Sequence, residues 1–145
     1  MMRVLLDTNV ILDAMLQRTP WHADTDAILH AAGRGEIICA VTTLSIANLF
    51  YIGRRLVGAQ QARSDVRTCL NTLQILAVDR QALMDADTLA GSDFEDNIQI
   101  AAAVAASLDA LVTRDLSGFS QAPMPVWSPS ELLHRLAQQH LPEDQ

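Results

Sequence analysis

Three aspartates of this sequence stand where side chains can meet at one edge of an α/β fold. Asp7 directly follows the apolar run Arg3–Leu6, and Asp115 comes shortly after the run Ala110–Val112. Asp96 lies in the first turn of a helical segment that leads into the second run. Because ligands of open parallel sheets bind outside the carboxyl ends of the strands, we expect these carboxylates to converge. Crowded carboxylates repel one another unless a cation compensates. The joint pattern therefore favours an oxygen-ligand site for Mg²⁺ or Mn²⁺, of the kind that activates water near a phosphate.

Each aspartate taken singly has a simpler structural interpretation. Asp7 can begin a turn, Asp115 can be a loop residue, and Asp96 can interact favourably with the dipole of its helix. Asp93, three residues earlier, can cap that helix or act as a secondary ligand, and capping is the favoured interpretation. The segment 92–95, Ser-Asp-Phe-Glu, fits a capping box at the start of the same helix.

The charged and reactive residues exclude several classes of enzyme. All ten positive residues are Arg and none is Lys, whereas the acids are thirteen Asp and four Glu. Without Lys the chain has no Schiff-base lysine, no pyridoxal-phosphate anchor and no P-loop lysine. The four His residues lack metal-ligand spacing, which disfavours a zinc site. Cys39 and Cys69 lie in apolar or helical patterns, so we expect buried thiols and no disulfide.

The elements that must position these residues alternate between short apolar runs and longer helical patterns. The predicted strands are Arg3–Leu6, Ile37–Val41, Ile75–Val78, Ala110–Val112 and Pro125–Trp127, and the predicted helical segments are 9–17, 22–33, 43–57, 59–72, 80–90, 93–107 and 129–139. Uniformly apolar runs are typical of strands that are covered on both faces of a parallel sheet. The alternation predicts an α/β fold with three layers, α/β/α, and a central parallel sheet of about five strands.

The organisation of the chain indicates one domain over residues 1–140, with a tail at 141–145. No stretch approaches the roughly 20 apolar residues that span a membrane. The apolar N-terminal run is interrupted by Asp7, and no small-residue cleavage site follows it. We therefore expect a cytoplasmic protein with no membrane segment.

The order of these motifs resembles the PIN domain (PilT N-terminus) family. RVLLDTNVILD is similar to the opening of PIN domains, and DFEDNIQIAAAVAASLDALVTRDLSGF is similar to their second half. The resemblance extends from Arg3 to roughly Leu133. It implies a PIN-like fold and a Mg²⁺- or Mn²⁺-dependent ribonuclease that cleaves RNA. It also implies that the chain is similar to VapC-type toxins, which form homodimers and are held by a cognate antitoxin.

The resemblance assigns roles to individual residues. Asp7, Asp96 and Asp115 match the first, third and fourth family acids, which would bind the cation and activate water for attack on the phosphodiester. Thr113 matches the polar residue that accompanies the fourth acid. Asn9 lies where its side chain can support the first carboxylate.

Two positions depart from the family pattern. The segment VTTLSIANLFYIGRR resembles the helix that supplies the second family acid, usually Glu, and Asn48 stands at that position. An Asn can offer a carbonyl oxygen to a cation but brings no charge, which weakens a two-metal site more than a one-metal site. Gly118 stands where many members carry Asp. The alternative to an active ribonuclease is therefore a PIN-fold binding or regulatory module with weakened catalysis.

The arginines are the residues most suited to contact RNA. The net charge of −7 argues against broad nucleic-acid binding, which depends on positive charge. One segment nevertheless has a local charge of +3, and Arg suits bidentate contacts with phosphate. Contact with RNA, contact with an acidic partner and a solvated helix face remain equally weighted for these residues. The residues concerned are Arg54, Arg55, Arg63 and Arg67 in that segment, and Arg114 beside the predicted site.

Overall fold

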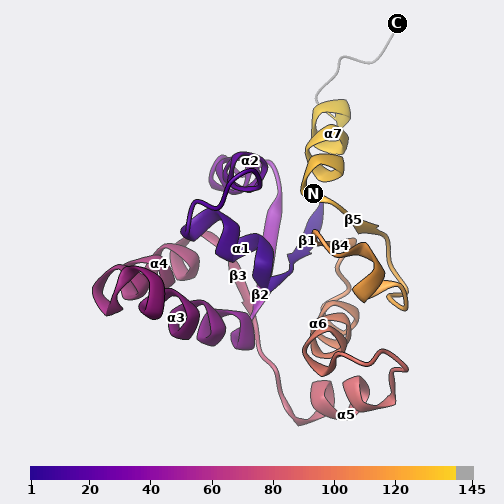
Figure 1. Ribbon diagram of the computed structural model, residues 1–145. Helices are drawn as coiled ribbons and strands as arrows, with labels where there is room; N and C mark the ends of the chain where they lie inside the picture. Colours follow the sequence, from indigo (N-terminus) through magenta and orange to yellow (C-terminus); the bar gives the residue numbers. More distant parts are fainter. Residues whose placement is uncertain (140–145) are drawn as a thin grey trace, which may run out of the picture.

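The computed structural model describes residues 1–139, and its elements follow the predicted alternation of strands and helices (Figure 1). The predicted tail at 141–145 lies outside these residues. The strands are β1 (Arg3–Leu6), β2 (Ile38–Thr42), β3 (Gln74–Leu76), β4 (Ala110–Val112) and β5 (Val126–Trp127). The helices are α1 (Thr8–Met15), α2 (His22–Gly33), α3 (Thr43–Val57), α4 (Ala59–Thr72), α5 (Arg80–Thr88), α6 (Phe94–Ala105), the 3-10 helix η1 (Leu116–Phe119) and α7 (Pro129–Gln139).

All five strands are parallel and lie in the order β3-β2-β1-β4-β5. In the register of the central strand, Leu5 lies opposite Ala40 of β2 and Leu111 of β4. The chain first adds strands on one side of β1 and then on the other, so the boundary between β1 and β4 is the point where the strand order reverses. Ligands of open α/β sheets bind at such a point.

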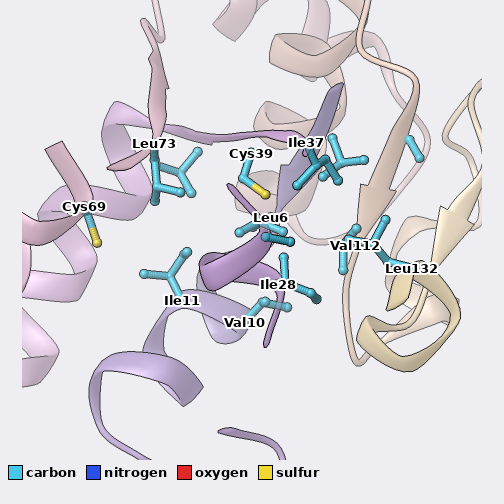
Figure 2. Close-up of a cluster of buried hydrophobic side chains, with 14 of the residues drawn as sticks. Leu6, Val10, Ile11, Ile28, Ile37, Cys39, Cys69, Leu73, Val112 and Leu132 are labelled. Atoms are coloured by element: carbon cyan, nitrogen blue, oxygen red, sulfur yellow. The ribbon is translucent and has the colours of Figure 1, made fainter. Parts of the chain in front are cut away.

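The side chains of the sheet alternate between two layers of helices, which confirms the predicted three-layer fold. On one face, Leu6 and Val112 pack with residues of α1, α2, α3, α4 and α7, and Figure 2 shows them near Val10, Ile28 and Leu132. On the other face, β-strand side chains pack against α6 and η1. Helix α5 packs against α6 and adds little to the sheet itself (Figure 1).

The helix caps explain where several elements begin. Asp79 caps α5 through the Ala82 amide, as a strand-to-helix junction favours, and Ser128 accepts from the Glu131 amide where α7 begins with proline. The capping box predicted with Ser92 as its first residue is wrong, because Asp93 is the cap of α6 and accepts from the Asp96 amide. A serine hydroxyl could also accept from this amide, but only a carboxylate adds a negative charge that interacts favourably with the helix dipole.

Two further predictions concern cysteines and membranes. Cys39 and Cys69 are free and buried, as predicted, and burial raises the pKa of each thiol to about 12. Within residues 1–139, no helix combines the length and the apolar character that crossing a bilayer requires.

Candidate functional site

The first carboxylate of the site, Asp7, is fixed where β1 passes into α1. Its backbone amide donates to the Val112 carbonyl at 2.9 Å, so the residue continues the pairing of β1 with β4. Its side chain is 5% exposed and accepts hydrogen bonds from Gln99 Nε2 at 3.1 Å and Thr113 Oγ1 at 2.8 Å. Both donors are neutral, so they orient the carboxylate without compensating its charge.

Thr113 connects this carboxylate to the end of β4. Its buried hydroxyl donates to Asp7 and accepts from the Asp115 amide at 3.0 Å. Asp115 in turn caps η1, because its Oδ1 accepts from Ser117 Oγ at 2.8 Å and from the Gly118 amide at 3.2 Å. Adjacent parallel strands thus present Asp7 and Asp115 at one edge of the sheet.

The third predicted carboxylate, Asp96, reaches the same edge from the first turn of α6. Partial burial raises the pKa of Asp96 to about 7, with additional contributions from the negative charges of Asp93, Asp7, Asp115 and Glu95. An effect of several carboxylates on one group requires that they lie near it. The structure therefore brings Asp7, Asp96 and Asp115 together, in the arrangement that the strand-end argument predicts.

Gly118 provides the space in which two of these carboxylates approach each other. A Cβ at this position would lie 2.7 Å from Asp115 Oδ2 and 3.0 Å from Asp96 Oδ2. Beside the two carboxylates is a polar cavity of about 430 Å³, bordered by the start of α6 and by η1. The glycine that departs from the family pattern thus leaves room at the centre of the site.

Asn48 lies at the site but contacts a residue that the sequence argument did not assign. Its Nδ2 donates to Glu95 Oε1 at 3.1 Å, and Thr8 Oγ1 lies 3.1 Å from the same oxygen. Thr8 also shares a hydrogen bond of 2.6 Å with Ser45 of α3. The capping-box interpretation concealed Glu95, although its position next to Asp96 at a helix start is a signal that can be read from the sequence.

Gln99 is a second residue of the candidate site that the sequence did not reveal, because it lies within an otherwise apolar helical pattern. Its side chain is 1% exposed, and its Nε2 is used by Asp7. Its Oε1 is buried without a hydrogen-bond partner, and no other buried side-chain nitrogen or oxygen of residues 1–139 shares that condition. Leaving such an acceptor unsatisfied costs about 1–3 kcal/mol, which favours a ligand or water beside Asp7.

The donor set suits a hard divalent cation. Carboxylate and amide oxygens are the ligands that Mg²⁺ and Mn²⁺ prefer, and the glycine at 118 leaves space between two of them. Within residues 1–139, no three His, Cys, Asp or Glu side chains already surround one point at ligand distances. The carboxylates lie at one edge of the sheet, and two of them, Asp96 and Asp115, both border the space at Gly118.

The remaining predicted residues lie at varying distances from this edge. Asn9 is exposed on α1, and Asp93 is occupied as the cap of α6. The head of Arg114 contacts Asp13 at 2.7 and 3.2 Å, and stacks over Trp21 with its central carbon 3.8 Å from the ring centre. The four arginines of α3 and α4 are exposed. They are Arg54, Arg55, Arg63 and Arg67.

Comparisons with known proteins agree with this architecture. The sequence profile described as PIN domain matches residues 3–117. No curated protein sequence matches the chain. The fold is similar to that of DNA-bound VapBC from Salmonella typhimurium (18% identity, TM-score 0.65, covering 89% of this chain and 99% of that chain). It is also similar to that of FitAcB from Neisseria gonorrhoeae (21% identity, TM-score 0.60, covering 88% of this chain and 98% of that chain). A third similar structure is the sarcin-ricin loop cleaving toxin VapC20 from Mycobacterium tuberculosis (11% identity, TM-score 0.66, covering 83% of this chain and 95% of that chain).

Proposed function

The chain belongs to the PIN domain family, and we propose that it is a Mg²⁺- or Mn²⁺-dependent endoribonuclease that acts as the toxin of a toxin–antitoxin pair. The observation that carries this proposal is the group of carboxylates at the β1–β4 edge, which no arginine of the described residues neutralises. Such a group is costly to fold and becomes favourable when a cation binds. The toxin role rests on the similarity to VapBC and FitAcB structures.

Some residues of the site would bind the cation, and others hold its ligands in position. Asp7, Asp96 and Asp115 would hold the cation, and Thr113 and Gln99 keep the Asp7 carboxylate in place. A bound divalent cation would supply a water nucleophile at neutral pH and offset the negative charge of the phosphate. No protein base is needed for this chemistry. The carboxylate of Asp96 must lose its proton before it can act as a ligand, because its pKa is about 7.

Arg55 is the arginine of α3 best placed to bind the RNA backbone. It follows Asn48 by seven residues, which puts both on nearly the same face of the helix and about 10 Å apart. Asn48 faces the site through its contact with Glu95. An exposed guanidinium two helical turns away would bind a neighbouring phosphate of an RNA strand whose scissile bond lies at the carboxylates.

The surface between α3 and α4 suits the antitoxin. It forms a groove of about 470 Å³ with an apolar floor and arginines at its border. Arg63 stacks over Phe50, Arg54 stacks over Tyr51, and Tyr51 is 55% exposed. An amphipathic helix with acidic flanks would bury the aromatic rings and pair with the arginines. A second copy of this chain is the competing occupant, and the mass of the isolated protein in solution separates a homodimer from an unpaired chain. The residues that line the groove are Ile46, Ala47, Phe50, Tyr51, Arg63, Val66, Arg67 and Leu70.

A cleavage assay tests the proposed reaction. Purified protein is incubated with a set of single-stranded RNAs in Mg²⁺, in Mn²⁺ and in chelator. We expect internal cleavage that needs the metal and disappears in Asp96→Asn. Asp85→Asn is the matched control, because it removes the same charge from an exposed position of α5.

Cleavage that persists in chelator would contradict the metal-dependent mechanism. Binding of RNA without cleavage in either metal would instead support the alternative of a PIN-fold binding module. Co-expression with a small DNA-binding protein encoded next to this chain tests the toxin role, and we expect it to relieve growth arrest.

A further inference from the structure

We propose that Glu95 is the fourth carboxylate of the cation site and that Asn48 and Thr8 are the residues that position it. This inference rests on the proposed function, since it assumes that the carboxylate edge binds a divalent cation. In this arrangement the fourth negative charge of the site lies on α6, and α3 supplies a hydrogen-bond donor to it.

The contacts of Glu95 are those of an oriented carboxylate that keeps its charge available. Its Oε1 accepts from Asn48 Nδ2 at 3.1 Å, and Thr8 Oγ1 lies 3.1 Å away. Both partners are neutral. The Oε2 atom has no hydrogen bond, and no ion pair involves Glu95 among residues 1–139. One oxygen is therefore held while the other is free to bind a ligand.

The position of Glu95 relative to Asp7 is fixed by two neighbouring contacts. Thr8, the residue after Asp7, contacts Glu95, whereas Gln99 on α6 donates to Asp7 itself. Glu95 and Gln99 are four residues apart and share one face of α6. The start of α1 and the first turns of α6 thus contact each other through both carboxylates, and Glu95 lies beside Asp7 at the edge of the sheet.

An independent observation indicates a ligand at this point. The Gln99 side chain is 1% exposed, and its Oε1 is a buried acceptor without a partner. That oxygen belongs to the amide that contacts Asp7, so it is within a few ångströms of the carboxylate edge. A cation or its coordinated water would satisfy this acceptor and bind Glu95 Oε2.

The proposal changes the interpretation of Asn48. An asparagine at this position is not a ligand that has lost its charge, because its donor nitrogen is directed at Glu95. A glutamate there would place two carboxylates against each other. The edge still carries four carboxylates, namely Asp7, Glu95, Asp96 and Asp115, and three helices or helix starts supply them.

The first experiment measures metal binding without RNA. Mn²⁺ is titrated by calorimetry into the full chain and into Glu95→Gln, which keeps an oxygen for the two donors. We expect an affinity about tenfold weaker in the variant. Glu131→Gln is the matched control, since the Glu131 side chain on α7 is 43% exposed and pairs with Arg135. We expect this control to bind Mn²⁺ as the wild type does.

The second experiment tests whether Asn48 acts through Glu95. Asn48→Ala removes the donor, and we expect it to weaken Mn²⁺ binding several-fold in the wild type. In the Glu95→Gln background the same change should have no further effect, because the residue it positions no longer carries charge. Thermal unfolding in chelator checks that each variant is folded.

The outcomes separate this inference from the proposed function. If Glu95→Gln binds Mn²⁺ as tightly as Glu131→Gln while Asp96→Asn loses binding, the inference is overturned and the metal-dependent site stands. Full additivity of Asn48→Ala and Glu95→Gln would likewise overturn the positioning role. If the wild type binds no Mn²⁺, both proposals fall.

Discussion

Two buried aspartates near α1 show opposite treatments of a negative charge. Asp13 is fully buried and is compensated, because Arg114 Nε and Nη2 contact it at 2.7 and 3.2 Å and Arg18 lies at 3.8 Å. Asp7, six residues earlier, is 5% exposed and receives its hydrogen bonds from the neutral groups of Gln99 and Thr113.

The difference shows which buried acids serve the fold and which serve a ligand. Arg114 directly precedes Asp115, yet its head is directed to Asp13 and stacks on Trp21. The nearest arginine in the sequence is therefore withdrawn from the carboxylate edge. A buried charge with a hydrogen-bonded arginine is compensated within the chain. A group of carboxylates held by neutral donors retains its negative potential for a cation.

The largest expected effect is a loss of RNA cleavage when a carboxylate of the uncompensated edge is neutralised. Asp7→Asn and Asp96→Asn each remove a proposed ligand of the cation. We expect RNA cleavage to fall at least ~100-fold, which is more than the loss of a residue that only hydrogen-bonds a metal ligand would cause. The free energy of unfolding in chelator should stay level or rise, because a repelled charge is lost. Cleavage rates and urea unfolding measure the two quantities. A loss of stability comparable to that of an Asp13 variant would contradict the comparison.

Changing Asp13, whose charge is compensated by arginines, should lower the stability of the fold and leave metal binding unchanged. Asp13→Asn leaves two arginines without their partner, and we expect a loss of about 2 kcal/mol. This is below the cost of a fully buried pair because the side chains of Arg18 and Arg114 are 30% and 27% exposed. The melting temperature should fall by roughly 4–8 °C. Calorimetric Mn²⁺ affinity at a temperature where the variant is folded should match the wild type, and a tenfold loss would place Asp13 in the site instead.

The pH dependence of the edge gives a third, smaller effect. The pKa of Asp96 is about 7, whereas an ordinary Asp titrates near 3.8, so the folded chain holds a proton that the unfolded chain releases. The stability from this proton is complete below about pH 4 and is lost as the pH rises through about 7. We expect chelator-treated wild type to lose stability relative to Asp96→Asn over that range.

Metal binding should follow the opposite course, with Mn²⁺ affinity rising as the pH approaches and passes about 7, because the ligand must lose its proton. Thermal unfolding and calorimetry at about pH 5, 6, 7 and 8 measure both trends. A stability difference between the two proteins that does not change with pH would show that Asp96 has no raised pKa.

The smallest expected effect comes from a single methyl group. Gly118→Ala would place a Cβ 2.7 Å from Asp115 Oδ2 and 3.0 Å from Asp96 Oδ2. These atoms end flexible side chains, so we expect little change in stability but Mn²⁺ binding a few-fold weaker, as the carboxylates are pushed apart. Gly33→Ala is the matched control, since a Cβ there meets nothing within 4 Å. Equal affinities in the two variants would show that the space at Gly118 is not needed.

The sequence predicted the parallel sheet and the carboxylate edge because both depend on local pattern. Apolar runs such as Arg3–Leu6 need helices on both faces, and the residue after such a run must emerge at the carboxyl edge. Asp7 and Asp115 follow from that rule. Element ends were less accurate: β2 begins at Ile38 and β3 at Gln74, one residue from the predicted starts, because strand ends depend on pairing with neighbours.

The contacts between distant elements were beyond the sequence argument. The pairing of Arg114 with Asp13 joins positions 101 residues apart, and the bond from Gln99 to Asp7 joins positions 92 apart. Neither follows from spacing along one helix or strand. Glu95 had a local interpretation as a capping-box residue, and only the approach of α3 and of the start of α1 to α6 replaced it with contacts to Asn48 and Thr8.

The sequence by itself determined the order of strands and helices, the absence of Lys and the edge at which Asp7, Asp96 and Asp115 meet. These properties depend on side-chain periodicity and on the direction of parallel strands, which are local. The tertiary structure decided which charges are compensated, because an arginine neutralises the carboxylate that packing brings within hydrogen-bond distance, whatever its place in the chain. Packing directed Arg114 to Asp13 and Asn48 to Glu95, and it left the edge negative.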